Sequence, residues 1–490
     1  MQRFDYVVIG SGLAGLTFAL RASEHGKVCV LTKAEITDSN TSWAQGGIAA
    51  AVGEADSWEL HEQDTLIAGA GLCDPQAVRF LVQQAPAAIE WLTGLGTRFD
   101  QESDGDLALG LEGGHSRHRI VHHQDKTGWE IERAISEAVH RHPDITVYEH
   151  AFVDKLLTSN GRCVGLRVRI EDREEDFCAR AVMLATGGCG RMYQHSTNPR
   201  VATADGIALA AEIGAKVANM EFMQFHPTTL YHPQARAYLI TEAVRGAGGI
   251  LRNHLGRRFM YDYDERLELA PRDVVARSIE FEMKKRETWC VYLDATHLKR
   301  QALQEEFPTI YEKLAEVGIE MEKDWIPVVP AQHYSCGGVA TDLDGRTTVP
   351  GLYAAGEVAS TGVHGGNRLA SNSLLEALVF ATAAAQAARE EPLVEELAPP
   401  GRKPHSITEA DALRIRRSLQ RTMTQHVGIV RNDAGLREAL SDVETLLAEY
   451  DSLPEAPFLP YALETRNLLV AAWHVAGGAL ARRENVGLHY

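Results

Sequence analysis

Runs of apolar residues alternate with helical patterns at the start of the chain. Residues 6–9 and 28–31 are continuously apolar, and residues 13–22 between them carry a helical pattern. Two buried parallel strands joined by a helix form a βαβ unit, here about 25 residues long, close to the usual length. The pattern therefore predicts a parallel sheet that begins at Tyr6.

The same alternation continues along the chain and predicts further elements. Strands that end in a glycine turn are expected at 181–188 and 351–357, and helices at 58–70, 75–92, 205–213 and 371–389. Residues 41–53 are rich in small and polar side chains and have no clear period. We expect this segment to be irregular and to wrap a ligand.

Changes of pattern predict four parts of the chain. Mixed short strands, charged helices and polar loops between Met220 and Tyr334 indicate an inserted α+β domain. Residues 390–405 contain several prolines and charges, which is typical of a linker. Amphipathic helices are expected at 408–426, 433–451 and 460–483, as a small bundle. The expected bounds are 1–219 and 335–404 for a discontinuous α/β domain with its linker, 220–334 for the insertion and 405–490 for the helical domain.

Charge and composition exclude several classes of partner. The chain has 490 residues, and 49 Lys+Arg against 67 Asp+Glu give a net charge of −18. Nucleic acid and anionic membranes are thus not expected as partners, since both need a basic surface. No apolar run is long enough for a membrane span, and no signal peptide is recognised at the start. We expect a cytoplasmic protein.

Metal ligands are also not expected. The seven cysteines are scattered without a C-x-x-C pair. His115, His118, His122 and His123 lie near one another in the sequence, but no further ligand follows at a matching spacing. We interpret these histidines as solvated or positional.

A glycine-rich loop follows the first strand and opens the first helix, as Gly10-Ser11-Gly12-Leu13-Ala14-Gly15. In this context the first glycine permits a tight turn, the second lets the backbone approach a pyrophosphate, and the third allows close packing of helix and strand. The helix N-terminus then offers free N–H groups to phosphates. The acidic residue that usually closes the second strand of NAD enzymes is replaced by Thr32, followed by Lys33. The loop predicts a dinucleotide, and Thr32 disfavours NAD.

Two later segments, 185–188 (ATGG) and 351–357 (GLYAAGE), resemble those of two-dinucleotide-type flavoproteins. The resemblance implies FAD, with Glu357 bonding a ribose or ribitol hydroxyl and the helix at Ser371 pointing at the pyrimidine end of the flavin. The residues expected to contact the cofactor are Gly10, Ser11, Gly12, Leu13, Ala14, Gly15, Lys33, Asn40, Thr41, Ser42, Trp43, Ala44, Gln45, Gly46, Gly47, Val153, Asp205, Glu357, Ser371, Ser373 and Leu374.

Five more segments resemble the succinate dehydrogenase/fumarate reductase/L-aspartate oxidase family. They are 221–228 (EFMQFHPT), 239–246 (LITEAVRG), 270–273 (APRD), 333–338 (HYSCGG) and 364–373 (HGGNRLASNS). The motifs stand in the family's order and cover nearly the whole chain. The resemblance implies a Rossmann-like FAD domain interrupted by a capping domain, and a dicarboxylate substrate.

The resemblance also implies the roles of individual residues. His226, His333 and Arg368 would bind carboxylates, with Thr241 and Gln224 beside them, because a bidentate arginine fixes a substrate's orientation. Arg272 would exchange a proton with the substrate carbon, helped by a relay through Glu242 and Arg245, since an isolated guanidinium is a poor base. Each has a structural alternative: a histidine in a loop is more often structural, and Arg272 can pair with Asp273.

Two features distinguish the branches of this family. Respiratory members carry a histidine that binds FAD covalently, whereas residues 39–48 here contain none, which implies non-covalent FAD. Before the pair Gly113-Gly114 stands Glu112, where dehydrogenases and reductases place an aromatic residue. A buried carboxylate there needs a partner, and the amino group of aspartate supplies one. An exposed loop glutamate is the alternative.

The L-aspartate oxidase branch is therefore the expected one. It implies oxidation of L-aspartate to iminoaspartate, reoxidation by O2 with release of hydrogen peroxide or by fumarate with formation of succinate, and transfer of iminoaspartate to quinolinate synthase in NAD biosynthesis. A soluble fumarate reductase or succinate oxidase, and a non-catalytic flavin-binding protein, remain as alternatives. The family's Ser-Arg-Gly-x-His element has Val486 in place of the arginine, which leaves open how residues 485–490 dock.

Overall fold

Five parallel strands form the central sheet, in the order β18-β11-β2-β3-β7. The strands are β2 (Tyr6–Ile9), β3 (Val28–Leu31), β7 (Ile145–Tyr148), β11 (Ala181–Leu184) and β18 (Leu352–Ala354). Parallel sheets are covered on both faces, which explains why β2, β3, β11 and β18 are buried throughout and have apolar sequences. Helix α1 (Leu13–Ala22) joins β2 to β3, so the predicted βαβ unit is confirmed.

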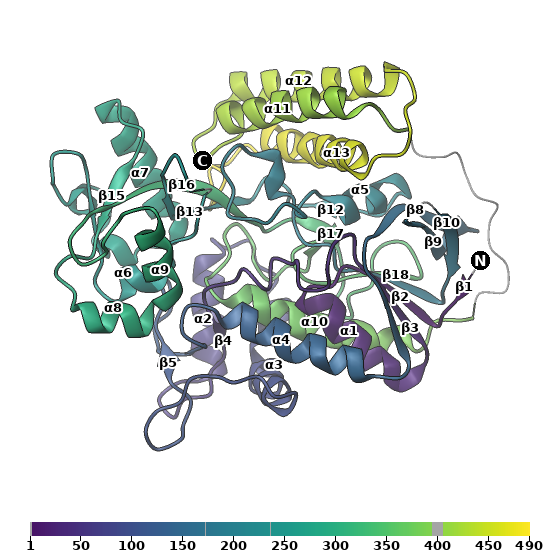
Figure 1. Ribbon diagram of the computed structural model, residues 1–490, viewed down its shortest axis with the longest axis horizontal. Coiled ribbons are helices and arrows are strands. Elements are labelled where there is room, and N and C mark those ends of the chain that lie inside the picture. Colours follow the sequence, from purple (N-terminus) through teal and green to yellow (C-terminus); the bar gives the residue numbers. More distant parts are fainter. Residues whose placement is uncertain (1, 172, 236, 394–404) are drawn as a thin grey trace.

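The computed structural model describes residues 2–171, 173–235, 237–393 and 405–490. One face of the central sheet packs on α1, α3 (Pro75–Gly94), α4 (Thr127–Arg141) and α10 (Asn372–Ala388). The other face packs on the antiparallel strands β8 (Ala151–Ser159), β9 (Arg162–Ile170) and β10 (Arg173–Cys178), and on α5 (Asp205–Glu212). Together they form the α/β domain seen at the centre of Figure 1.

The insertion has a sheet and a hydrophobic core of its own. Its antiparallel strands follow the order β13-β16-β15-β14. The elements are β13 (Met223–Leu230), α6 (Glu242–Gly246), β14 (Ile250–Arg252), α7 (Arg272–Arg286), β15 (Val291–Asp294), α8 (Arg300–Glu306), α9 (Pro308–Glu316) and β16 (Ile326–Ser335). Leu251, Phe259 and Ile279 are fully buried in this core. In Figure 1 this capping domain lies at one end of the molecule.

The predicted three-helix bundle is also present, as α11 (Glu409–His426), α12 (Asp433–Ser452) and α13 (Pro460–Ala481). It lies above the α/β domain in Figure 1 and shares one core with it. Of the predicted linker, residues 394–404 lie outside the described residues. Within the described part of the chain, no helix combines the length and apolarity that crossing a membrane would require.

Two segments differ from the sequence-based expectations. Residues 41–53 are not irregular throughout, because the two-residue strand β4 (Ile48–Ala49) pairs with β6 (Ile120–Val121). Such a short pairing leaves no periodic pattern to detect. Residues 486–490 do dock although Val486 replaces the family's arginine: Leu488 N donates to Gly366 O over 2.9 Å, and Arg431 N to Tyr490 O over 2.8 Å.

Candidate active site

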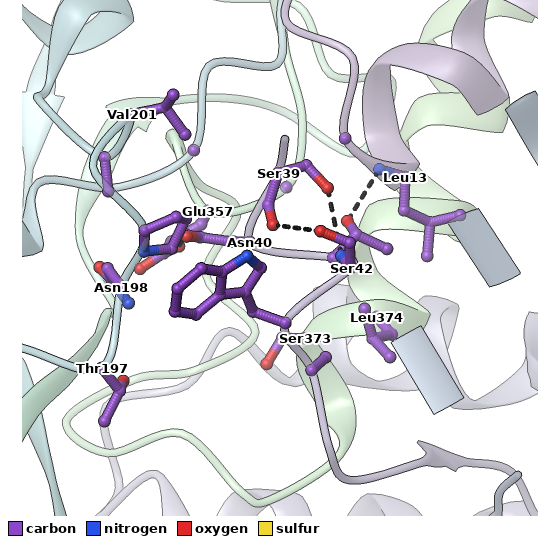
Figure 2. A pocket seen from close by; sticks show the side chains of 18 of the residues that line it. Leu13, Ser39, Asn40, Ser42, Thr197, Asn198, Val201, Glu357, Ser373 and Leu374 are labelled. Atoms are coloured by element: carbon purple, nitrogen blue, oxygen red, sulfur yellow. Dashed lines mark hydrogen bonds between the residues drawn. The ribbon is translucent and has the colours of Figure 1, made fainter. Parts of the chain in front are cut away.

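A cavity of about 770 Å³ lies between the α/β domain and the capping domain, and residues of both line it. One part is lined by the glycine loop and α10, and the other by histidines and arginines from the capping domain and the 364–371 loop. Figure 2 shows the first part, with Leu13, Asn40, Glu357 and Leu374 around it. The cavity therefore joins the predicted cofactor residues to the predicted substrate residues.

The glycine loop has the backbone geometry that a dinucleotide site needs. Gly10 has φ +107°, and a Cβ there would overlap the carbonyl of Ala185. Gly12 caps α1 and offers no side-chain acceptor, so the N-terminal N–H groups of the helix face the cavity apart from Leu13 N, which donates to Thr41 Oγ1 over 3.0 Å. This end of the cavity can receive an anionic pyrophosphate.

Glu357 lies on the cavity wall, where the flavoprotein resemblance expects it. Asn40 Nδ2 and Ser335 N donate to its carboxylate over 2.5 and 3.0 Å. Burial nevertheless raises the pKa of Glu357 to about 7. The Asn40 Oδ1 atom is buried without a partner among the described residues, so it remains as an acceptor for a ligand hydroxyl.

The N-terminus of α10 faces the same cavity. Its capping residue, Ser371, has φ +61° and does not cap the helix with its side chain. Ser371, Ser373 and Leu374 line the cavity beside it. These features fit FAD. Its phosphates would bind at the glycine loop and the N-terminus of α1, and its hydroxyls would meet Glu357 and the unpaired Asn40 oxygen. Its reducible ring would lie at the open N-terminus of α10.

Lys33 takes part in the cavity wall but is already paired. Its Nζ donates to Thr203 Oγ1, Asp205 Oδ2 and Glu464 Oε1 over 2.5, 2.7 and 2.7 Å. Asp205 lines the cavity as predicted. Lys33 therefore holds β3, the loop before α5 and α13 together, in addition to bordering the site.

His226 is a neutral donor that points into the substrate part of the cavity. It is fully buried, and burial together with Arg272 and His333 holds its pKa well below the usual value. Thr228 N donates to Nδ1 over 3.2 Å, so the proton of the neutral ring sits on Nε2. That Nε2 atom is buried and meets no acceptor in the described residues. A ligand carboxylate would satisfy it.

The Arg368 guanidinium contacts three neighbouring side chains, and its Nε–H group has no partner among the described residues. Its Nη2 and Nη1 donate to Gln224 Oε1 and Ser373 Oγ over 2.7 and 2.6 Å, and its guanidinium lies 4.5 Å from the centre of the Tyr334 ring. Its Nε has no partner within the described chain. Burial and the charge of Arg272 lower its pKa to about 10, so it remains cationic at neutral pH.

Arg272, the first residue of α7, pairs with Glu242 rather than with Asp273. Arg272 Nε lies 2.6 Å from Glu242 Oε2, and Arg245 Nη2 lies 3.6 Å from Glu242 Oε1. Burial would raise the pKa of Glu242, but the two arginines outweigh it and hold the pKa below its usual value. Asp273 pairs with Arg277 instead, over 3.0 Å. Arg272 and Glu242 are therefore joined by a hydrogen bond, whereas Arg245 lies beside Glu242 as an ion-pair partner at 3.6 Å without a hydrogen bond to it.

Glu112 is buried at the same cavity, and is not an exposed loop residue. Ser371 Oγ donates to its Oε2 over 2.7 Å. Burial, followed by the nearby charge of Glu242, raises its pKa, while Arg272 acts in the opposite direction. A cationic or N–H donor group of a ligand would stabilise its carboxylate form.

The predicted site residues divide into a lining and a supporting layer. Every predicted residue lines the cavity except Gly15, Gln224, Glu242 and Arg245. Gln224 lies behind the two arginines, and its Oε1 accepts from Arg272 Nη1 over 3.4 Å as well as from Arg368. The sequence resemblance predicts that Gln224 contacts the substrate, whereas in the structure its side chain supports Arg272 and Arg368.

Other lining residues gave no signal in the sequence. Asn198 Nδ2 donates to His333 O over 2.8 Å, and Thr197 Oγ1 lies 2.8 Å from His333 Nδ1. Thr309, Glu312, Lys313 and Glu316 of α9 also line the cavity. His115, by contrast, is not solvated: it is buried, with Nε2 2.9 Å from Ala370 O, and holds the loop before Ser371.

Known proteins resemble this chain over its whole length. The profile described as "FAD binding domain" matches residues 5–374, and the one described as "Fumarate reductase flavoprotein C-term" matches residues 416–490. L-aspartate oxidase 1 of Ralstonia nicotianae is 46% identical, over 100% of this chain and 95% of its own. L-aspartate oxidase of Vibrio cholerae is 44% identical, over 99% and 95%.

Solved structures show the same fold. A quinol fumarate reductase variant of E. coli superimposes with a TM-score of 0.92 at 30% identity, over 100% of this chain and 91% of that one. An Sdh1 structure from Mycobacterium smegmatis gives a TM-score of 0.82 at 33% identity, over 100% and 89%. The predicted fold class, an FAD domain with an inserted capping domain and a helical C-terminal part, is confirmed.

Proposed function

The chain belongs to the L-aspartate oxidases of the succinate dehydrogenase/fumarate reductase flavoprotein family, and on this basis we propose that it oxidises L-aspartate to iminoaspartate. FAD is its cofactor, as the matched FAD-binding profile shows. We propose that FAD is bound without a covalent link, because residues 39–48 contain no histidine.

The observation that carries the choice of substrate is the position of Glu112. A dicarboxylate finds donors at His226 Nε2 and Arg368 Nε, both buried and without a partner in the described part of the chain. Succinate and fumarate satisfy these donors but have no N–H group for Glu112, whose carboxylate then keeps Ser371 Oγ as its one described hydrogen-bond donor. The amino group of L-aspartate offers N–H donors to this buried carboxylate, so the site favours the amino acid.

In the proposed reaction the amino group enters neutral, its nitrogen lone pair forms the C=N bond as the Cα hydrogen leaves as a hydride, and the resulting iminium releases one N–H proton to water to give iminoaspartate. Bound FAD supplies the hydride acceptor. Arg368 and His226 orient the two carboxylates, and Glu112 accepts a hydrogen bond from the amine and directs its lone pair toward Cα. Because these side chains are already in position in a buried site, they orient the substrate with little rearrangement of the protein at each turnover.

Arg272 is better suited to the reduction of fumarate than to the oxidation of an amine. In fumarate reduction a carbon must receive a proton, and Arg272, which is hydrogen-bonded to Glu242 with Arg245 close by, can supply it. We therefore propose that fumarate can act as the electron acceptor, giving succinate, besides O2, giving hydrogen peroxide. Iminoaspartate would pass to quinolinate synthase for NAD biosynthesis, in the cytoplasm.

Anaerobic addition of L-aspartate to the FAD-loaded protein tests the proposal. We expect the flavin absorbance to bleach, and admitted oxygen to restore it with release of hydrogen peroxide. A soluble fumarate reductase would not bleach with L-aspartate but would oxidise a reduced dye rapidly with fumarate. A flavin-binding protein without activity would respond to none of these dicarboxylates.

A further inference from the structure

Residues 486–490, which we call the 486–490 segment, contact the supports of both substrate arginines. The segment follows α13 in the sequence, but it leaves the bundle and reaches the capping domain and the 364–371 loop. None of its residues lines the cavity.

The first set of contacts reaches Arg368. Leu488 N donates to Gly366 O over 2.9 Å, two residues before Arg368. Gly487 has φ +56° and lies so close that a Cβ would overlap the Gly366 carbonyl. The Leu488 side chain is buried in a cluster with Phe222, Tyr334 and Cys336. The Arg368 guanidinium lies over the Tyr334 ring, so Leu488 belongs to the cluster in which that ring packs.

The second set of contacts reaches α7, which begins at Arg272. Arg277 Nη1 donates to Gly487 O over 3.1 Å, and its guanidinium lies 4.8 Å from the centre of the Tyr490 ring. Arg277 also pairs with Asp273, which accepts from Asn367 Nδ2 over 3.2 Å. The segment thus contacts Arg277, which pairs with Asp273, the neighbour of Arg272. Asp273 in turn accepts a hydrogen bond from Asn367, the neighbour of Arg368.

A third contact fixes the segment to the bundle. Arg431, between α11 and α12, donates its N–H to Tyr490 O over 2.8 Å and its Nη1 to Glu221 O over 2.8 Å. The segment consequently joins the bundle, the capping domain and the 364–371 loop at one place. From this geometry we propose that the 486–490 segment positions Arg272 and Arg368 for dicarboxylate binding.

The proposal rests on the proposed function only in taking these two arginines as the carboxylate-binding groups. A shift of about 1 Å in an orienting group can weaken a reaction about a hundredfold. Loss of Leu488 packing or of the Tyr490 contact should therefore act on binding of the dicarboxylate, while the FAD site, built by other residues, keeps its cofactor.

Succinate binding to the FAD-loaded protein, followed by the change in flavin absorbance, provides the test. We expect Leu488→Ala to raise the Kd for succinate about tenfold and Tyr490→Ala about threefold, with FAD content unchanged. The KM for L-aspartate should rise in parallel, and kcat should change less. Leu488→Met, which keeps the volume, should restore most of the affinity. Lys284→Ala, on an exposed part of α7, and Arg483→Ala, just before the segment, serve as matched controls and should leave the Kd unchanged.

An unchanged succinate Kd in both Leu488→Ala and Tyr490→Ala would overturn the proposal, as would equal weakening in the two controls. A chain ended after Asn485 is the stronger variant, and if it does not fold, the two substitutions still decide the question. Because succinate binding is measured without turnover, a protein that fails to oxidise L-aspartate can still show the role of the segment. The experiment therefore distinguishes a failure of the proposed L-aspartate oxidation from a failure of the proposed role of the 486–490 segment.

Discussion

Glu112 is the residue on which the choice between substrates depends. Its carboxylate is buried and has one described hydrogen-bond donor, Ser371 Oγ. We predict that Glu112→Gln lowers kcat/KM for L-aspartate about a hundredfold, because an amide attracts the substrate's amine much less than a carboxylate does. Fumarate reduction should fall less than about threefold, since fumarate has no amine. Steady-state kinetics in both directions provide the measurement, and similar losses in the two reactions would contradict the role given to Glu112.

Glu132 offers a pH-dependent prediction on the protein without FAD. It is buried on α4, accepts from Ser39 Oγ over 3.0 Å, and burial raises its pKa to about 8. A raised carboxyl pKa means that the folded state holds the proton more tightly than the unfolded state. Its contribution to stability is therefore complete below about pH 4.5 and is lost as the pH rises toward 8, at up to about 1.4 kcal/mol per pH unit.

Thermal melting between pH 6 and 9 tests this prediction. The melting temperature of the unmodified protein should fall across that range, and Glu132→Gln, which keeps a neutral hydrogen-bonding group, should flatten the decline. Glu137→Gln, at a half-exposed position on the same helix, is the matched control. If the unmodified protein and the Glu132 variant show the same pH slope, the raised pKa is wrong.

Elements differ in how far the sequence predicts them. Four of the five central strands were predictable, because strands buried on both faces are apolar at every position, and helix α1 follows from its glycine loop. The edge strand β7 was not predicted, because it is only partly buried and contains a polar residue. The two-residue strand β4 was not, since pairing with β6 across a long loop leaves no local pattern. The neighbouring positions of β18 and β11 in the sheet likewise depend on tertiary packing.

The residues of the site also divide into those that the sequence predicts and those that only the folded structure brings together. Residues whose backbone or chemistry is distinctive, such as Gly10, Glu357 and Arg368, could be predicted from motifs and resemblance. The family resemblance of residues 221–228 predicts Gln224 at the substrate, whereas its Oε1 accepts from Arg368 and Arg272. Asn198 is a single polar residue in a loop, and only the folded chain brings it to His333.

Helix α9 gives a prediction about the capping domain. Asp125 of the α/β domain accepts from Thr309 Oγ1 over 2.8 Å and from Ile310 N over 3.0 Å, at the first turn of α9. We predict that Asp125→Ala speeds amide hydrogen exchange in α9 and lowers kcat/KM for L-aspartate about tenfold, because α9 lines the cavity. Asp125→Asn, whose amide oxygen can still accept, should lose less. Unchanged exchange in α9 would contradict a role for Asp125 in holding the capping domain.

At the scale of the whole molecule, Lys33 connects distant parts of the chain. Its Nζ pairs with Asp205, the first residue of α5, and with Glu464 on α13, and all three side chains are largely buried. We predict that Lys33→Met lowers the free energy of unfolding by about 3 kcal/mol, because buried Asp205 loses its cation and Glu464 keeps only Arg416, at 3.4 Å. Glu464→Gln should cost less, since Lys33 keeps Asp205. Denaturant titration measures both, and a stability loss in Lys33→Met no larger than that in Glu464→Gln would contradict this account.

The order of strands in the central sheet has a consequence for synthesis on the ribosome. β18 lies beside β11 but is translated only after the whole capping domain. At usual elongation rates the edge of β11 stays uncovered for on the order of ten seconds or more, long enough for a chaperone to bind it. FAD can be enclosed only after Ser371–Leu374 have left the exit tunnel. Nascent chains stalled before β18 should therefore retain no flavin, while those stalled well beyond α10 should.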